Sequence, residues 1–498
     1  MSHSPHTDTV LRDLGVLVQV PGLMALGSLP ICFIFGETFA VPGLLVTAAA
    51  SLALGQGLYW RYRAAGAMQL RHAMATAVLA WILIPVIGTI PFLSVAGALG
   101  EAGGTSTTVL SFQSPLNALF ESVSGFTSTG LSVASHPSEL PHILQWWRSF
   151  TQWVGGVGVI VLVLTVFHPS ADAERLYFSE AREGHIYPDI VSTVRAIWWI
   201  YLLFTVGGVL LLRVAGMGWW DAVNHGMTGI ATGGFSTRDD SIAGDGLGVR
   251  AVMLFLIIAG AISFNSHFQI LTKAKVSLLW KDLENRALFV LLAAGAVLVF
   301  LENLWVFKDD FYIDSIFQWA SALCTAGFQT VDLRSWSPTA LLLLTVGMIV
   351  GGAAGATTGG LKLHRVLVLA GSTLHRIRRV SIQPWRLMEH KSITPEQDTH
   401  GVGPNVEAAA LIGGLWLACI AAGSIALLHV GDFSLNQAIF EAASAIGNVG
   451  LSAGIAGADL GWFGKLTLML LMWIGRLEIV PVLVLASSVV RWAGRQKM

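Results

Sequence analysis

Residues 120–132 read Phe-Glu-Ser-Val-Ser-Gly-Phe-Thr-Ser-Thr-Gly-Leu-Ser, and related stretches occur at 224–236, 317–329 and 440–452. Each stretch contains a glycine that stands ten residues after Phe or Asn, six residues after Ser or Thr, and directly before Leu or Phe. These glycines are Gly130, Gly234, Gly327 and Gly450. Four copies of one pattern in a single chain indicate an internal fourfold repeat.

A short apolar segment precedes each copy, for example at 115–123 and 316–323. Such a segment is too short to cross the roughly 30 Å hydrocarbon core of a bilayer, but it can enter the core as a half-helix. Glycine permits backbone dihedrals that direct successive carbonyl oxygens to one side. Four such loops around one axis would replace the hydration shell of a potassium ion, and each half-helix would direct its negative end at the same ion. The loops are therefore predicted to form a cation filter.

Three residues of each copy are the candidate ion-binding positions. They are Ser128, Thr129, Gly130, Thr232, Gly233, Gly234, Thr325, Ala326, Gly327, Asn448, Val449 and Gly450. The alternative interpretation is that these glycines only allow helices to pack closely, as small residues do in membranes. Close packing does not require one order of polar and apolar residues in four loops, so we favour the filter.

The composition places these loops in an integral membrane protein. Of 498 residues, 54% are hydrophobic and 12% are charged, against roughly a quarter charged in soluble domains. The mean hydropathy is +0.67, which excludes an ordinary soluble enzyme. A net charge of −1 gives no electrostatic reason to expect a nucleic-acid partner. Cys32, Cys324 and Cys419 show no metal-binding or redox spacing, so we expect no cofactor.

Ten apolar runs are long enough to cross a bilayer. They cover residues 14–35, 41–58, 72–96, 143–167, 191–212, 249–271, 287–304, 338–370, 408–428 and 463–484. The last eight form four pairs, and each pair encloses one glycine loop. We therefore expect an all-α membrane protein with four span–loop–span repeats in pseudo-fourfold symmetry around one pore. The predicted division is a two-span hairpin at 1–66 and repeats at 67–170, 171–275, 276–390 and 391–498.

The basic residues predict the topology. If both termini and every connector between pairs lie on one side, that side contains all but eight of the 29 Lys and Arg residues. The positive-inside rule then places both termini in the cytoplasm. The N-terminal residues lack the order of a cleaved signal, so we expect the first span to be retained. The longest basic connector, 364–391, is a topology signal or a docking surface, and we favour the former.

The eighth run is interrupted by a stretch of small residues, 351–360, that is a poor helix former. It is a close-packed, kinked helix or a movable loop.

Arg476 lies about midway along the tenth run, where an uncompensated charge costs ~3 kcal/mol or more. It either pairs with an acid such as Glu478 or lies in the pore, and Lys362 either extends to the interface or faces the pore. Four acidic residues flank the glycine loops: Glu121, Asp221, Asp239 and Glu441. They either concentrate cations at the mouth of the pore or are solvated loop charges.

The repeated span–loop–span pattern resembles the Trk/Ktr/HKT superfamily of potassium transporters, and the two additional N-terminal spans resemble the TrkH type. Further matches are the segments 155–158, 351–362 and 475–478. The resemblance implies that the four glycines belong to filter loops that prefer potassium over sodium. It also implies a gate that consists of Gly351, Gly352, Gly355, Gly359, Gly360 and Lys362 of a loop below the filter, and Arg476. The copies differ from the usual pattern at Gly233, Cys324, Ala326 and Asn448-Val449.

The resemblance further implies a homodimer in a bacterial cytoplasmic membrane, controlled by a TrkA-like ring of nucleotide-binding subunits. The sequence has no Walker or Rossmann motif, so nucleotide control would come from a separate chain. Two alternatives are a symporter that couples potassium to protons or sodium, and, more distantly, a membrane-embedded enzyme. We find no acid pair, Ser-His pair or His-metal group suited to catalysis and expect no enzymatic activity.

Overall fold

The computed structural model describes residues 5–103, 106–158, 190–307, 312–381 and 404–484. All regular elements within these ranges are helices, and there is no strand. The expected all-α membrane fold is therefore confirmed. Six helical stretches in the described part of the chain are long and apolar enough to cross a membrane: Thr7–Ile34, Thr38–Tyr62, Arg71–Glu101, Ser192–Val214, Leu283–Val306 and Val406–Leu428.

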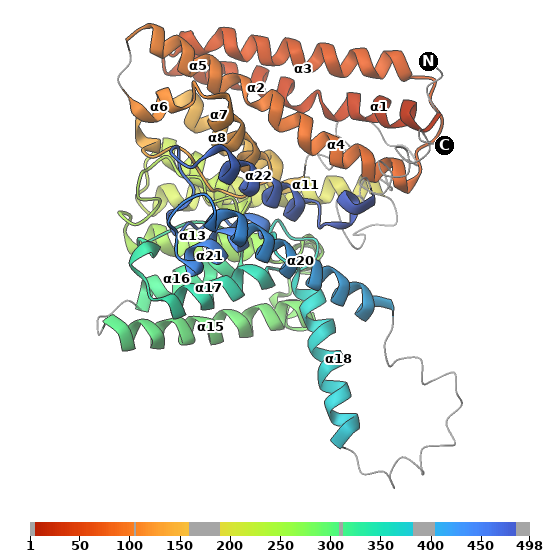
Figure 1. The fold of residues 1–498 in the computed structure, drawn as a ribbon, viewed down its shortest axis with the longest axis vertical. Coiled ribbons are helices and arrows are strands. Elements are labelled where there is room, and N and C mark those ends of the chain that lie inside the picture. The colour runs from red at the N-terminus through yellow and green to blue at the C-terminus, as the bar shows by residue number, and fades with distance from the viewer. Residues whose placement is uncertain (1–4, 104–105, 159–189, 308–311, 382–403, 485–498) are drawn as a thin grey trace.

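The N-terminal hairpin and the first span of each repeat account for these six stretches. The hairpin contains α1 (Pro5–Leu17), α2 (Val20–Ile34) and α3 (Val41–Tyr62). The first spans are α4 (Leu70–Gly88) with α5 (Ile90–Glu101), then α11 (Ile190–Val214), α15 (Leu283–Phe307) and α20 (Pro404–Leu428). Figure 1 shows α3 and α15 along opposite edges of the bundle.

Four half-helices of 12 residues each precede the glycine loops: α7 (Pro115–Phe126), α12 (Trp219–Ile230), α16 (Tyr312–Leu323) and α21 (Leu435–Ile446). Twelve residues rise about 18 Å, roughly half the bilayer. Local signals fix where two of them begin. Pro115 occupies the first turn of α7, and the hydroxyl of Ser434 accepts a hydrogen bond from the backbone N–H of Gln437 at the start of α21. The descending half-helices expected from the sequence are thus present.

The break in the eighth apolar run was expected, but breaks in the fourth, sixth and tenth runs were not, because the helices of all four second spans end partway along their runs. They are α8 (His142–Val157), α13 (Leu247–Ala261), α17 (Pro338–Val350) and α22 (Trp462–Arg476). Positive φ angles at Gly158 and Gly351 end α8 and α17. After α22, positive φ angles at Glu478 and Ile479 interrupt the helical conformation. Ser263 begins a new helix, α14 (Phe264–Lys273), which is bent by 105° from α13. The remainder of the run at 143–167 lies outside the described residues.

The basic stretch 364–391, expected to be a loop, also begins as a helix, α18 (Leu363–Ser381). Apolar residues recur at helical spacing along it, and most of the remaining positions are basic, apart from Gly371, Ser372, Thr373 and Ser381. Residues 382–391 lie outside the described residues. Figure 1 shows α18 extending away from the bundle at the end where α20 begins.

The repeats close into a ring. The second span of each repeat packs against the half-helix of the next, in the pairs α8 with α12, α13 with α16, α17 with α21, and α22 with α7. The last pair joins the C-terminal repeat to the first, so the packing returns to its starting point. Four consecutive segments of one chain are therefore arranged around a central axis.

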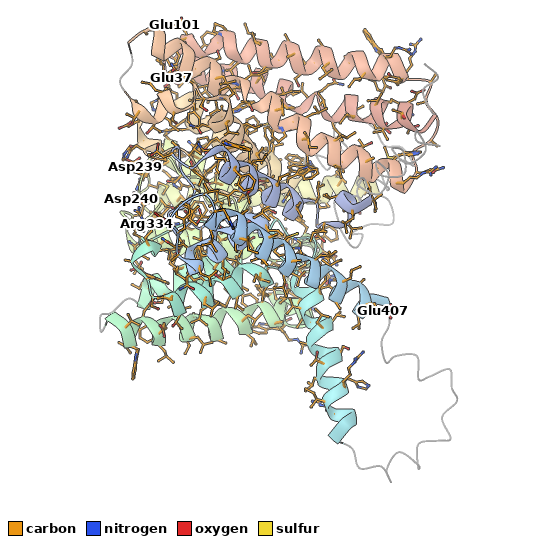
Figure 2. The ribbon with its side chains drawn as sticks, viewed as in Figure 1. Glu37, Glu101, Asp239, Asp240, Arg334 and Glu407 are labelled. Atoms are coloured by element: carbon orange, nitrogen blue, oxygen red, sulfur yellow. The ribbon has the colours of Figure 1, made fainter. Side chains whose placement is uncertain are left out.

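Charged side chains mark the two ends of this ring. Figure 2 shows Glu37, Glu101, Asp239, Asp240 and Arg334 along one edge of the molecule and Glu407 at the opposite end. The connectors that contain the glycine loops thus emerge at one end, as the pairing of the apolar runs predicted. The shorter helices α6 (Thr107–Ser111) and the 3₁₀ turns Pro137–Glu139 and Leu333–Ser335 lie in these connectors.

Glu37 attaches the N-terminal hairpin to the ring. Its buried carboxylate accepts hydrogen bonds from the backbone N–H groups of His142 (2.7 Å) and Ile143 (2.8 Å) in the first turn of α8. A carboxylate at this place satisfies unpaired donors and interacts favourably with the helix dipole.

We expect Glu37→Ala to destabilise the protein by about 1–2 kcal/mol, because two N-terminal amides of α8 lose their acceptor. The measurement is the thermal unfolding midpoint of the purified protein in detergent. Glu101→Ala, at an exposed position on the same edge, is the control and should leave the midpoint unchanged. Equal midpoints for both variants would contradict the assigned role.

Candidate functional site

The four glycine loops share one backbone conformation. Ser128, Thr232, Thr325 and Asn448 have φ between 49° and 56°, and the glycine two residues after each has φ between 79° and 98°. A left-handed conformation is uncommon for residues other than glycine and is retained only where the surroundings enforce it. Its recurrence at the same position of all four copies shows that the repeat extends to the backbone.

Hydrogen bonds to the half-helices hold these loops. The backbone N–H of Thr129 donates to the carbonyl oxygen of Ser124 (2.9 Å), five residues earlier. The equivalent bonds are Gly233 to Thr228 (2.9 Å), Ala326 to Ser321 (2.8 Å) and Val449 to Ser444 (2.9 Å). The loop amides are therefore directed back at the C-terminal ends of the half-helices.

The Ser or Thr six residues before the glycine has a structural explanation. In repeats 1 and 4, the hydroxyls of Ser124 and Ser444 accept from the backbone N–H groups of Gly130 (3.0 Å) and Gly450 (3.1 Å). In repeat 3 the hydroxyl of Ser321 donates to the carbonyl of Phe328 instead. In these three repeats the hydroxyl thus fixes the chain at the glycine or one residue after it, whereas in repeat 2 the hydroxyl of Thr228 donates to the carbonyl of Asn224 within its own half-helix (3.1 Å).

The four glycines meet around the axis. A Cβ at Gly234 would lie 2.9 Å from the Cα of Gly327, and one at Gly450 would lie 2.9 Å from the Cα of Gly130. A Cβ at Gly130 would collide with the carbonyl oxygen of Gly233, and one at Gly327 with that of Val449. Each loop therefore contacts the next in the order of the repeats, and any side chain at these positions would enter a neighbouring loop.

A cavity of about 180 Å³ lies on one side of this ring and is lined by all four glycines. Arg148, Arg238 and Asp239 also line it. Partial burial raises the pKa of Asp239, but hydrogen bonds from Ser138 and His136 outweigh this effect and hold the pKa below its ordinary value. Asp239 therefore carries a negative charge at neutral pH at the mouth of the ring.

The loop 351–362, which we call the gate loop, packs against the other side of the ring. The backbone N–H of Gly359 donates to the hydroxyl of Thr325 (2.8 Å), and that of Gly360 donates to the carbonyl of Gly447 (3.1 Å). The hydroxyl of Thr357 lies within hydrogen-bonding distance of the carbonyls of Ile230 and Gly260. The gate loop thus contacts the filter loops or half-helices of repeats 2, 3 and 4.

Two further contacts fix the gate loop near its beginning. The backbone N–H of Ala353 donates to the carbonyl of Ala261 at the end of α13 (3.0 Å), and that of Ala354 donates to the carboxylate of Glu284 (2.8 Å). Of the two interpretations of this segment, the structure therefore has a non-helical loop rather than a kinked helix.

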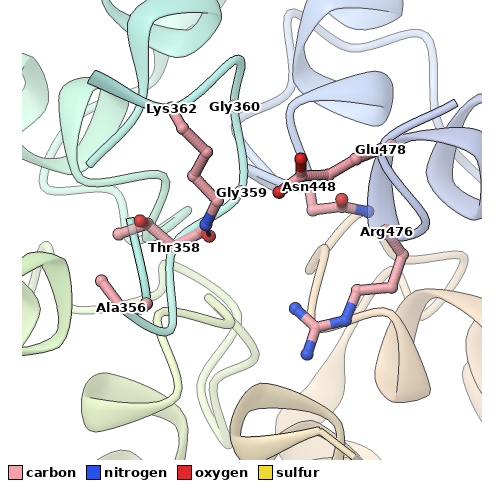
Figure 3. Close-up of a pocket in the computed structure, with 10 residues that line it drawn as sticks. Ala356, Thr358, Gly359, Gly360, Lys362, Asn448, Arg476 and Glu478 are labelled. Carbon is pink, nitrogen blue, oxygen red and sulfur yellow. Dashed lines mark hydrogen bonds between the residues drawn. The ribbon is translucent and has the colours of Figure 1, made fainter. Parts of the chain in front are cut away.

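A second cavity, of about 40 Å³, lies between the gate loop and the end of α22. This volume holds about three water molecules. Figure 3 shows Lys362 and Thr358 on one side and Asn448, Arg476 and Glu478 on the other. The ammonium group of Lys362 donates to the carbonyl of Thr358. Five of the seven candidate gate residues therefore line one cavity, and these are Gly355, Gly359, Gly360, Lys362 and Arg476, whereas Gly351 and Gly352 do not line it.

The comparisons with known proteins agree with this geometry. Residues 43–491 match the family model TrkH, described as cation transport protein. The chain belongs to the TrkH family.

Among its relatives, an uncharacterized cation transporter of Methanocaldococcus jannaschii is 31% identical, with coverage of 96% of this chain and 95% of the relative. The Trk system potassium uptake protein TrkH of Escherichia coli is 29% identical, with coverage of 96% and 98%. The crystal structure of the potassium transporter TrkH from Vibrio parahaemolyticus superposes with a TM-score of 0.79 at 25% identity, over 96% of this chain and 98% of that one. The chain thus shares both the sequence family and the fold of cation transporters.

Arg476 is placed differently from our expectation. It ends α22 rather than lying inside a helix, and its guanidinium donates to the carbonyl of Gly155 at the C-terminal end of α8. The ring of Trp81 lies 5.1 Å from the guanidinium carbon. The carboxylate of Glu478 pairs with Arg365 on α18 (2.5 Å), so a pair between Arg476 and Glu478 is not what the structure contains. The negative end of the α8 dipole contributes to the stabilisation of the Arg476 charge.

Two acidic residues were also misassigned from the sequence. Glu121 and Glu441 are neither mouth charges nor solvated, because both are 0% exposed. Glu121 accepts from the hydroxyl of Ser132 (2.8 Å), and Glu441 accepts from the hydroxyl of Ser452 (2.8 Å). Glu121 is further paired with Arg148 at 2.7 Å, a charge partner from α8.

Sequence reasoning missed the equivalent residues of the other two repeats. His225 lies within hydrogen-bonding distance of the hydroxyl of Ser236 (3.0 Å), and Gln318 donates to that of Thr330 (3.2 Å). All four residues stand nine positions before the filter glycine and bond to the chain 11 or 12 positions further on. The fixed offset was available in the sequence, but the four residue types differ, which concealed the common role.

We expect Glu441→Gln to lower the stability of the TrkH-family fold by about 1–3 kcal/mol. Glu441 accepts bonds from the backbone N–H groups of Ala453 and Ala456 (both 2.9 Å), and an amide nitrogen placed against either would leave a buried donor unsatisfied. The thermal unfolding midpoint in detergent measures the effect. Glu407→Gln, at an exposed position at the other end of the bundle, is the matched control. The same midpoint in both variants would show that Glu441 does not brace the loop.

Proposed function

We propose that this chain takes up potassium across a bacterial cytoplasmic membrane through the ring formed by its four glycine loops. The observation that carries the proposal is the closed ring of glycines with a repeated backbone conformation. Relatives named as potassium uptake proteins support the choice of ion.

The proposed filter consists of residues 128–130, 232–234, 325–327 and 448–450. Because the loop amides donate to the half-helices, the loop carbonyls remain to bind an ion. In the part of the chain that the structure describes, the carbonyl oxygens of Thr129, Ala326 and Val449 accept no hydrogen bond. Four half-helices that end at the filter add the negative ends of their dipoles. Cation binding then needs no acidic side chain at the ring.

The proposed gate consists of the gate loop, including Lys362, together with Arg476. The absence of side chains at Gly351, Gly352, Gly355, Gly359 and Gly360 would let the loop move aside with little steric hindrance. In the closed form, the positive charges of Lys362 and Arg476 face a cavity with room for about three water molecules, so they oppose the passage of a cation.

The proposal also covers the orientation of the chain in the membrane, its oligomeric state and its regulatory partner. The positive-inside rule supports cytoplasmic termini, and the mouth cavity with Asp239 then faces outward. We further propose a homodimer, as well as control by a separate TrkA-like ring of nucleotide-binding subunits on the cytoplasmic side, where α18 extends from the bundle. A reversal potential that shifts with pH or with sodium would favour the coupled symporter over passive conduction.

We expect Gly234→Ser to relax the selectivity of the filter, because a side chain at this position would enter the loop of repeat 3. The measurement is rubidium uptake into liposomes that contain the purified protein, with potassium or sodium as competitor. Wild-type uptake should be blocked by potassium and not by sodium, whereas both should block uptake by the variant. If wild-type uptake is blocked equally by both ions, the potassium filter is disproved. If uptake is absent, addition of the regulatory subunit distinguishes a closed pore from an incorrect assignment.

We expect Arg476→Ala to raise rubidium uptake about tenfold or more, because it removes a positive charge from the inner cavity. Arg476→Lys retains the charge and is the control, with uptake near that of the wild type. Unchanged or abolished uptake in a well-folded Arg476→Ala protein would contradict the barrier.

A further inference from the structure

Repeat 2 departs from the other three at the position before the filter glycine. Thr129, Ala326 and Val449 carry side chains there, whereas Gly233 does not. A loop packed around an ion site does not tolerate an unfilled space, since the lost contacts would let the backbone move. Another part of the molecule must therefore occupy the place of the missing side chain.

Gln152 of α8 occupies that place. The side chain belongs to repeat 1, is 0% exposed, and reaches across the boundary between the repeats. A Cβ at position 233 would lie 2.5 Å from the Oε1 atom of Gln152 and 2.6 Å from its Cδ atom. The amide of Gln152 thus fills the volume that the residue before the glycine fills in the other loops.

The same amide makes two hydrogen bonds to the filter backbone. Its Nε2 atom donates to the carbonyl oxygen of Gly233, and its Oε1 atom accepts from the backbone N–H of Phe235 (3.0 Å). These two partners flank Gly234, the filter glycine of repeat 2. One planar group therefore fixes the peptide on both sides of Gly234.

Only a primary amide of this length fulfils both functions. A carboxylate can accept from Phe235 but cannot donate to Gly233, and an aliphatic side chain would leave a buried N–H and a buried carbonyl unpaired. Asn has the same groups on a shorter chain and would not reach. The residue type is thus constrained by a donor and an acceptor in fixed positions.

The bond to Gly233 also makes the ring chemically unequal. The equivalent carbonyls of the other three repeats accept no hydrogen bond within the described residues, whereas the Gly233 carbonyl already has a protein donor. An N–H donor lowers the capacity of a carbonyl oxygen to bind a cation and restricts its movement. Gln152 on α8 therefore controls both the mobility of the Gly233 carbonyl and its capacity to bind a cation.

We propose that Gln152 is a positioning residue that holds the repeat 2 loop in its ion-binding form and thereby determines the preference for potassium over sodium. This inference rests on the proposed function, since it assumes that the ring binds potassium.

The test uses the full-length purified protein and two readouts. The first is the rise of the thermal unfolding midpoint in potassium relative to sodium, which reports ion binding whether or not the gate is open. The second is rubidium uptake into liposomes in competition with each ion. The variants are Gln152→Leu and Gln152→Glu. Gln145→Leu is the control because Gln145 is a buried amide of the same helix that bonds to Pro137 and Trp220 instead.

We expect Gln152→Leu to lower the potassium-to-sodium preference about tenfold in both readouts, and Gln152→Glu to lower it too, because neither donates to Gly233. Gln145→Leu should keep the wild-type preference even if its midpoint falls. Gly233→Ala alone should also lower the potassium-to-sodium preference, since its Cβ would collide with Gln152. The double variant Gln152→Ala with Gly233→Ala, which imitates Ala326 of repeat 3, restores the volume but neither hydrogen bond, so it should be as unselective as Gln152→Ala.

Two results would overturn the inference. One is a wild-type ion preference in Gln152→Leu, which would reduce Gln152 to a packing residue. The other is a double variant with wild-type preference, which would show that the filled volume and not the two hydrogen bonds determines the preference. A wild-type protein with no potassium-dependent midpoint rise and no potassium-sensitive uptake would instead disprove the proposed function, and the inference with it.

Discussion

The structure depends on one hydrogen bond that occurs four times. In each repeat, the backbone N–H before the filter glycine donates to a half-helix carbonyl five residues earlier. This bond closes the end of a helix whose last carbonyls would otherwise be unpaired, and it leaves the loop carbonyls unused by the half-helix. In a membrane interior, where unpaired backbone groups are costly, the loop cannot relax into another form. The left-handed residues at the base of each loop are retained for this reason.

The other parts of the molecule reinforce that bond from different directions. Buried side chains nine residues before the glycine brace the outer part of each loop, and the second span of each repeat packs against the next half-helix. The glycines of these spans allow the close approach, since a Cβ at Gly475 would collide with the carbonyl of Ile446. The gate loop contributes from the inner side, through Gly359 and Gly360.

Much of this arrangement could be predicted from the sequence. The recurring glycine, the half-length apolar segments and the break at 351–360 gave the fold, the ring of loops and the non-helical segment. The continuity of the second spans in repeats 1, 2 and 4 was predicted wrongly, because hydropathy measures apolar length and is insensitive to a change of φ at Gly158 or Glu478. The burial of Glu121 and Glu441 could not be predicted from the sequence either. A carboxylate beside a loop looks solvated until the amides that bind it are known.

The fourfold ring is built by one chain, and within the described residues only repeat 3 places such a loop against it. For the proposed gate this has a thermodynamic consequence. In a pore of four identical subunits, four copies of a gate open, and cooperativity between them makes the response to a signal steep. A single loop that rests on three neighbouring repeats has only its own equilibrium between two positions. Its open fraction would change gradually with the free energy applied to it, so a steep response would have to originate outside the pore, in whatever chain acts on that loop.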